Sequence, residues 1–157
     1  MISIRRAQPD DVKTIMGFIR QLAIYEKAEH EVVASEAQTH DVLFGPHAHC
    51  DAMIAEHNGE PVGFALYFFN YSTWLGRPGL YLEDLFVMPE SRGLGAGKGL
   101  LKALAKVAVE RNCGRFEWSV LDWNTPAIEF YESLGAEPQS EWTIYRVTGQ
   151  ALEALAR

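Results

Sequence analysis

The sequence predicts an α+β fold, and three observations lead to that prediction. Strand-like segments dominate the first part of the chain, where apolar residues alternate or run together. The second part alternates strand, helix, strand, helix and strand. The length of 157 residues, 48% of them hydrophobic and 22% charged, suits a single domain over residues 1–157.

The N-terminal part begins with a short strand at Ile2, Ile4 and Ala7, and Pro9 then marks a helix entry. Apolar residues at spacings of three and four follow on one helix face: Val12, Ile15, Met16, Ile19, Leu22 and Ala23. We expect a second helix over 36–43, then strands over 50–56, 62–71 and 80–88. Turns are expected at Asn58-Gly59 and Pro78-Gly79.

The C-terminal part starts with a helix that carries Leu100, Leu104 and Ala108 on one face. We expect this helix to stop at 112–114 and a strand to follow over 115–121. Asn124 opens the next helix, and Gly135 lies where a C-terminal cap belongs. A last strand over 141–147 and a tail helix over 150–156 complete the prediction.

Composition excludes several classes of protein. A net charge of −7 disfavours a general nucleic-acid binder, which needs a basic face. The most apolar stretch, 62–69, is far shorter than the ~20 residues of a membrane helix. Two cysteines are too few for a disulfide framework, so we expect a cytoplasmic protein. His47, His49 and Cys50 lack the second ligand pair of a structural zinc site, so no metal is expected.

The stretch 92–99, Arg-Gly-Leu-Gly-Ala-Gly-Lys-Gly, lies between a predicted strand and a helix, where backbone N–H groups attract phosphate. The P-loop pattern fails, because Arg92 replaces its first glycine and Gly99 its hydroxyl residue. The dinucleotide pattern fails because its third glycine falls on Lys98 or Leu100. The pattern Arg-x-x-Gly-x-Gly fits from Arg92. A flexible turn without a ligand remains the alternative.

That pattern resembles the pyrophosphate loop of the Gcn5-related N-acetyltransferase (GNAT) family. Asn124-Thr125-Pro126-Ala127, with Phe130-Tyr131 and Gly135, is similar to the second coenzyme motif of that family. Further matches resemble its diamine (spermidine/spermine) acetyltransferase subgroup, and within it the thialysine branch: Tyr25-Glu26, His49-Cys50, Tyr71-Ser72-Thr73-Trp74, Tyr81-Leu82-Glu83-Asp84 and Leu121-Asp122-Trp123-Asn124. The resemblance implies one N-acetyltransferase domain with a mixed, mostly antiparallel splayed sheet flanked by helices.

The resemblance implies acetyl-CoA as the acetyl donor and assigns residues to it. Backbone groups of Leu85, Phe86 and Val87 would bind the pantetheine arm like an added strand. The pyrophosphate would be held by residues 92–98. The coenzyme set is Leu85, Phe86, Val87, Arg92, Gly93, Leu94, Gly95, Ala96, Gly97, Lys98, Asn124, Thr125, Pro126, Ala127 and Tyr131.

Two catalytic residues are implied by the same resemblance. Glu83 matches the proposed base, although a solvated strand carboxylate is the plain reading of its position. Tyr131 matches the acid that protonates the departing thiolate, although a half-buried packing tyrosine is the plain reading. Strand alternation places Asp84 on the face opposite Glu83.

The amine acceptor is a cation at neutral pH, because alkylammonium groups have a pKa of about 10.4. The resemblance gives acceptor contacts to Tyr25, Glu26, Glu83, Asp84, Glu117, Trp118 and Ser119. Ser72 replaces an acidic residue of the long-polyamine enzymes. A shorter diamine or a lysine-like amine is therefore expected.

We therefore expect direct acetyl transfer from acetyl-CoA to a small primary amine, by a homodimer with neither nucleic-acid nor membrane partners. Acetylation of a protein lysine or N-terminus is the alternative among enzymes. A coenzyme A sensor without catalysis is the alternative from another class. A nucleotide hydrolase is disfavoured, since Gly99 stands where that loop needs a hydroxyl residue.

Overall fold

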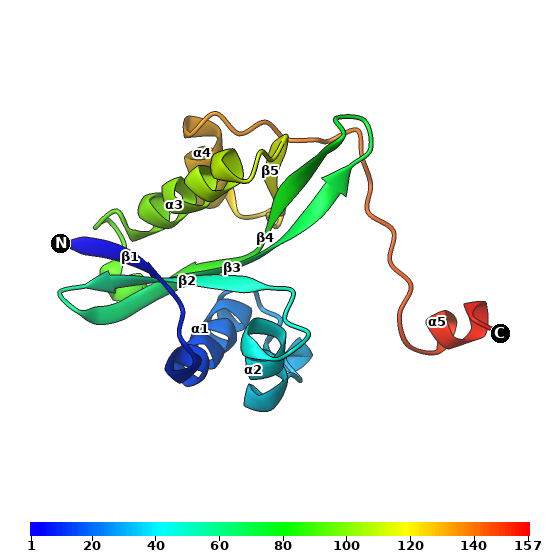
Figure 1. Cartoon of the computed structure of the whole chain (residues 1–157), viewed down its shortest axis with the longest axis horizontal. Helices are drawn as coiled ribbons and strands as arrows, with labels where there is room; N and C mark the ends of the chain where they lie inside the picture. The colour runs from blue at the N-terminus through cyan, green and yellow to red at the C-terminus, as the bar shows by residue number, and fades with distance from the viewer. The chain divides into compact units, whose positions relative to one another are not determined.

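Five strands form one sheet in the computed structural model, which describes residues 1–157 (Figure 1). They are β1 (Ile2–Arg6), β2 (Asp51–His57), β3 (Glu60–Ser72), β4 (Arg77–Val87) and β5 (Arg115–Trp118). Their order in the sheet follows the chain, β1-β2-β3-β4-β5, and only the β4–β5 pair is parallel. The predicted α+β class with a mostly antiparallel sheet is confirmed. The chain divides into two units, 1–119 and 120–157, which are described separately.

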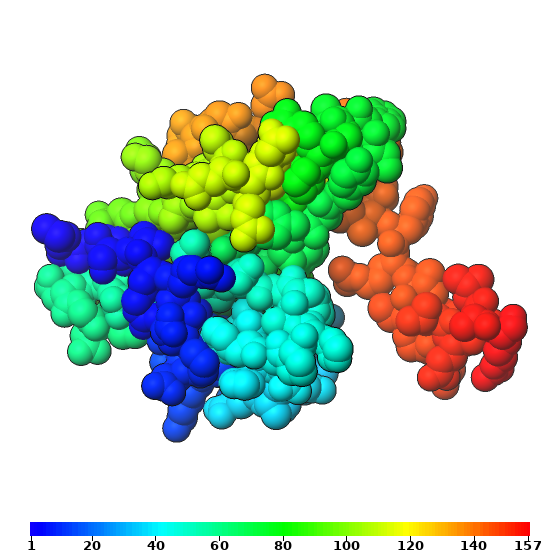
Figure 2. Space-filling model, viewed as in Figure 1, coloured from blue at the N-terminus to red at the C-terminus, as the bar shows by residue number.

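Helices cover both faces of the sheet in the first unit. Helices α1 (Val12–Tyr25) and α2 (Glu36–Phe44) lie on one face and α3 (Ala96–Glu110) on the other (Figure 1). The blue atoms of α1 and the cyan atoms of α2 adjoin in Figure 2. Short 3-10 turns complete the unit: η1 (Pro9–Asp11), η2 (Glu29–Glu31) and η3 (Pro89–Ser91). The core below α1 and α2 is apolar and includes Ile15, Phe18, Ile54, Phe64, Leu66 and Phe86.

The β3–β4 hairpin corrects one predicted turn. The chain reverses at residues 73–76, where the Ser72 hydroxyl accepts from the Leu75 N–H at 3.2 Å. Pro78 and Gly79, expected as the turn, instead lie within β4. Gly79 serves close packing, because a Cβ there would collide with Asn70 Oδ1.

A β-bulge in β4 sets the face of the sheet on which Asp84 lies. Asp84 pairs with Leu66 and Leu82 pairs with Tyr67, so Glu83 has no partner residue on β3. Residues that pair across strands share a face, and Leu66 belongs to the core under α1. Asp84 therefore lies on the α1 face. Its position opposite Glu83 stays a prediction, because Glu83 has no partner on β3 that fixes its face.

The outer edge of β4 is open beyond Leu82. Strand β5 pairs with β4 only over Gly79–Leu82. The Met88 N–H donates to the Val62 carbonyl at 2.8 Å, so the Met88 backbone faces β3. Backbone groups alternate along an antiparallel strand, which directs those of Leu85 and Val87 to the open edge and those of Phe86 to β3. This splay is the one that the resemblance implied.

The second unit contains helix α4 (Thr125–Ser133) and helix α5 (Gly149–Leu155). Gly135 follows α4 with a φ of 93°, the left-handed conformation of a C-terminal cap, as predicted. The strand predicted over 141–147 is absent, and an extended segment joins the two helices (Figure 1). A strand needs a neighbour to satisfy its backbone, and this segment pairs with none.

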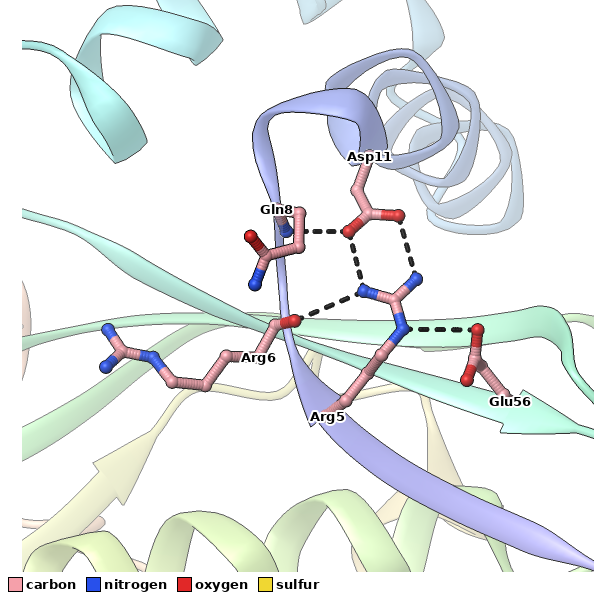
Figure 3. A network of polar contacts seen from close by, with 5 residues as sticks. All are labelled: Arg5, Arg6, Gln8, Asp11 and Glu56. Atoms are coloured by element: carbon pink, nitrogen blue, oxygen red, sulfur yellow. Dashed lines mark hydrogen bonds and ion pairs between the residues drawn. The ribbon is translucent and has the colours of Figure 1, made fainter.

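Figure 3 shows a polar network that ties β1 to η1 and β2. The Arg5 guanidinium donates to both Asp11 carboxylate oxygens, at 2.7 and 2.9 Å, and pairs with Glu56 at 3.1 Å. The Gln8 backbone N–H donates to the same Asp11 carboxylate at 2.7 Å. These bonds, above all those from Arg5, hold the pKa of Asp11 below its ordinary value despite burial.

Replacing Asp11 by asparagine should lower the free energy of unfolding by about 1–3 kcal/mol at neutral pH. Because the folded pKa is depressed, the stabilisation is present above the unfolded pKa of about 3.9 and fades as pH falls through the lower folded pKa. Urea titrations at neutral and acidic pH measure the difference. Asp10→Asn, at an exposed neighbour, is the control and should change stability by less than about 0.5 kcal/mol.

Candidate active site

The open edge of β4 lies beside the glycine loop. The backbone groups of Leu85 and Val87 face this edge, and a Cβ at Gly97 would lie 3.8 Å from Val87 Cγ2. The start of α3 therefore adjoins the end of β4. Two candidate binding elements for an elongated, phosphate-bearing ligand thus come together, one strand-like and one anion-binding.

The loop has the backbone geometry that its glycines allow. Gly93 and Gly95 have φ values of 85° and 89°, which side chains rarely adopt. Gly95 caps α3 without a side-chain bond, so the first N–H groups of the helix, with Lys98 in its first turn, are available to an anion. Gly93, Leu94 and Lys98 are exposed, while Ala96 is buried.

Three carboxyl groups gather where β4 bulges. Glu83 is exposed, and Asp84 beside it is mostly buried on the α1 face. Burial, followed by the charges of Glu83 and of Glu26 at the end of α1, raises the pKa of Asp84 to about 6. No hydrogen bond or ion pair to Asp84 is found. A cation bound here would offset the free-energy cost of burying the Asp84 carboxylate and would reduce its repulsion by Glu83 and Glu26.

Cys50 borders the same acidic cluster. Burial, with smaller effects from Glu83 and Asp51, raises the pKa of its thiol. Both cysteines of the chain are free. No group of three or more metal-ligating side chains converges anywhere in the structure. The raised pKa favours the protonated thiol of Cys50, and Cys50 belongs to no cluster of metal-ligating side chains.

The end of β5 brings the remaining acceptor candidates next to β4. Glu117 pairs in register with Tyr81, and Trp118 with Leu82, just before the strands diverge. Ser119 Oγ lies 3.0 Å from the Tyr81 hydroxyl. Glu117 forms an ion pair with Arg115 Nε at 3.1 Å, so its charge is already partly balanced. Of the four acceptor carboxyls, Glu117 alone has an ion-pair partner, and Asp84 is the one whose pKa burial raises to about 6.

A small apolar pocket of about 240 Å³ lies between the end of α1 and the end of β4. It is lined by Gln21, Ile24, Tyr25, Phe86, Pro89 and Arg92. The Arg92 guanidinium lies over the Tyr25 ring, 5.2 Å from its centroid, and its Nε donates to the Val87 carbonyl at 3.3 Å. Sequence reasoning missed Gln21 and Ile24, although Gln21 lies four residues before Tyr25, one helical turn away.

The second unit presents the other candidate coenzyme motif on α4. Asn124 is buried at the N-cap, and its side chain accepts from the Ala127 N–H at 3.4 Å. Pro126 occupies the first turn, where its missing N–H costs nothing. Tyr131 is half-buried on the same helix, beside Phe130. Thr125 is exposed before it.

Ser72 has a structural role that its sequence position did not predict. Its side chain is buried, and its hydroxyl and carbonyl accept from Leu75 and Gly76 in the hairpin turn. The expected loss of an acceptor carboxylate at this position stays a prediction.

No helix has both the length and the apolar character needed to cross a membrane.

Comparison with known proteins identifies the family of the chain. The model of the acetyltransferase (GNAT) family matches residues 13–136. A thialysine N-epsilon-acetyltransferase of Sus scrofa is 42% identical over 99% of this chain and 97% of its own length. The L-ornithine N5-acetyltransferase of Arabidopsis thaliana is 34% identical over 97% of this chain and 86% of its own length.

Solved structures share the fold. An integron cassette protein from the mobile metagenome of V. cholerae aligns with a TM-score of 0.82 and 30% identity, covering 99% of this chain and 98% of its own. A ribosomal-protein-alanine N-acetyltransferase from Brucella melitensis biovar Abortus 2308 aligns with a TM-score of 0.75 over 95% of this chain and 99% of its own. Its 19% identity supports the fold alone.

Proposed function

The chain belongs to the GNAT acetyltransferase family and is an amine N-acetyltransferase, and from this premise we propose that it acetylates a small lysine- or ornithine-like amine with acetyl-CoA. The observation that carries the proposal is the buried, unpaired carboxyl of Asp84 beside the open edge of β4. Relatives named for thialysine and L-ornithine acetylation support this acceptor class. The family match runs through both units, which supports one N-acetyltransferase domain over residues 1–157.

The coenzyme would use the open edge and the glycine loop together. Leu85 and Val87 offer free backbone groups to the amides of the pantetheine arm, while Phe86 lends its side chain to the adjoining pocket wall. The pyrophosphate would meet the first N–H groups of α3, with Arg92 and Lys98 as its cations. Asn124, Thr125, Pro126 and Ala127 form the second coenzyme motif. An N–H of the β4 edge would also stabilise the developing oxyanion.

The acceptor would enter as an ammonium ion and react as an amine. Asp84 and Glu26 attract the cation, and Glu83, exposed in the bulge, takes its proton directly or through water. The neutral nitrogen would form the new C–N bond with the acetyl carbon while the C–S bond breaks, and it would lose its second proton to solvent as the amide forms. Tyr131 would give its phenolic proton to the departing thiolate and regain one from solvent. Glu117, Trp118 and Ser119 line the acceptor side from β5.

The proposal is tested by thiol release from acetyl-CoA with thialysine, ornithine, diamines, spermine and lysine peptides as acceptors. Thialysine and ornithine should give the highest kcat/KM. If a lysine peptide gave the highest kcat/KM, the proposed acceptor class would be wrong, whereas acetyl transfer to an amine would stand. Coenzyme A binding without turnover on any amine would favour a sensor and contradict the proposal.

We also infer that the enzyme is a cytoplasmic homodimer whose C-terminal segment, residues 141–147, pairs with the sheet of a second copy. Residues 143–147 form no backbone hydrogen bond, and Trp142, Ile144 and Tyr145 are 66%, 77% and 93% exposed. Strand β5 has an open outer edge and is followed by exposed Val120 and Leu121. In a two-fold dimer, the segment of each copy would pair its unsatisfied backbone N–H and C=O groups with those of the open β5 edge of the other copy. The free cysteines support a reducing compartment.

Substitution within this segment tests the dimer. Ile144→Pro removes a backbone donor and should give a monomer by light scattering, because a ladder needs that N–H. Ile144→Val keeps the β-propensity and should remain a dimer. A monomeric wild type over the whole concentration series, or a dimeric proline variant, would exclude this pairing. A wild-type monomer with a protected segment in hydrogen exchange would indicate pairing within one chain instead.

A further inference from the structure

Arg92 connects three parts of the site described above. It immediately precedes the glycine loop, its Nε donates to the Val87 carbonyl at the open β4 edge, and its guanidinium covers the Tyr25 ring. Tyr25 is the last residue of α1 and adjoins the Glu26 carboxyl of the acceptor cluster. One side chain therefore contacts both the coenzyme side and the acceptor side.

The contacts that hold Arg92 are weak ones. The single hydrogen bond is long, at 3.3 Å, and lies at an exposed position. A cation over an exposed aromatic ring gains only about 0.5–1 kcal/mol. A guanidinium has five donors, and bonds to phosphate are charge-assisted and often bidentate. A diphosphate at the neighbouring loop is thus the stronger partner for this arginine.

The Tyr25 face that Arg92 covers is also suited to the acceptor. An alkylammonium ion seeks an aromatic face with carboxylates nearby, which Tyr25 and the acidic cluster provide. The guanidinium is itself a cation on that face, so it stands in for the ammonium. Acceptor and arginine cannot occupy the ring face together.

We propose that Tyr25 is a positioning residue for Arg92, and that Arg92 occupies the acceptor's aromatic cation site until the coenzyme pyrophosphate draws it away. This rests on the proposed function and adds a coupling between the two ligands: bound coenzyme frees the aromatic cation site for the amine. Departure of Arg92 also clears the Val87 carbonyl for an amide N–H of the pantetheine arm. The coupling is reciprocal, so each ligand strengthens the binding of the other by the same factor.

Calorimetry on the whole chain tests the coupling, with thialysine as the amine and coenzyme A as the second ligand. Saturation with coenzyme A should tighten amine binding about two- to fivefold in the wild type, the worth of one exposed cation–π contact. Tyr25→Leu should lose this coupling and tighten coenzyme A binding by a similar factor in the absence of amine. Tyr25→Phe keeps the ring and should retain the coupling.

A general attraction between anionic coenzyme and cationic amine would leave the coupling intact in Tyr25→Leu, and that result would overturn the proposal. Weaker coenzyme A binding by Tyr25→Leu would also overturn it, because the ring would then prepare Arg92 for the phosphate. Thermal unfolding and Ile24→Ala, which alters the same pocket wall, control for loss of structure. Wild type that binds no coenzyme A would refute the proposed function itself. Turnover without coupling would refute only this inference.

Discussion

Replacing Tyr131 by phenylalanine should lower kcat by about 10²–10⁴-fold and change coenzyme A binding far less, because general acids contribute about this much to the rate. The substitution removes only the hydroxyl, and the ring keeps its place beside Phe130 on α4. Thiol release under saturating substrates measures kcat, and calorimetry measures binding. The loss should be greatest for the step in which the thiolate leaves.

Tyr71→Phe is the matched control, since Tyr71 is exposed on the hairpin and its backbone carbonyl, not its hydroxyl, contacts Arg115. It should retain full turnover. Unchanged turnover of Tyr131→Phe, under conditions where chemistry limits the rate, would contradict the assignment of Tyr131 as the acid. A burst of product would reveal whether release is limiting instead.

Replacing Asp84 by asparagine should raise the acceptor KM by about tenfold or more and at the same time stabilise the fold at alkaline pH. The amide keeps the shape but not the charge that attracts the ammonium, and a lost charge-assisted bond costs about 1.5–3 kcal/mol. The gain in stability arises because asparagine removes a carboxylate whose charge is unfavourable in the folded chain. Burial first, then Glu83 and Glu26, raises the pKa of Asp84 to about 6.

The direction of the pH effect follows from that raised pKa. The folded chain ionises Asp84 less readily than the unfolded chain, so ionisation penalises folding as pH rises from about 4 to above 6. At pH 8 the variant should exceed the wild type by about 1–3 kcal/mol in unfolding free energy, and near pH 4 by little. Urea titrations at both pH values measure this.

The acceptor kcat/KM of the wild type should rise through the pH range in which Asp84 ionises, and the variant should lack that rise. Glu60→Gln, at the exposed β2–β3 turn, is the control for loss of one negative charge. An unchanged acceptor KM in Asp84→Asn would place the amine elsewhere. Unchanged stability at pH 8 would mean that the carboxyl finds a counter-ion in solution.

The conformation of the glycine loop could be predicted from the local sequence. Gly93 and Gly95 adopt left-handed conformations that few other residues tolerate, so the chain itself specifies the turn before α3. Asn124 and Pro126 specify the start of α4 in the same local way. Such features depend on a few consecutive residues, and they were predictable for that reason.

The pairing of strands was harder to predict from the sequence. Pro78-Gly79 has the composition of a turn, but partners across the hairpin place both residues within β4. The strand expected over 141–147 has the right residues and no neighbour in the single chain. A strand is a property of a pair, so its own sequence specifies half of it.

The sequence by itself determined the fold class, the turn of the glycine loop and the acidic character of the acceptor candidates, because each follows from residue type and spacing. Only the tertiary structure decided the face of Asp84 and the position of the Arg92 guanidinium. The physical reason is the same for both. A bulge depends on register with a second strand, and a cation over a ring depends on a helix that is distant in sequence.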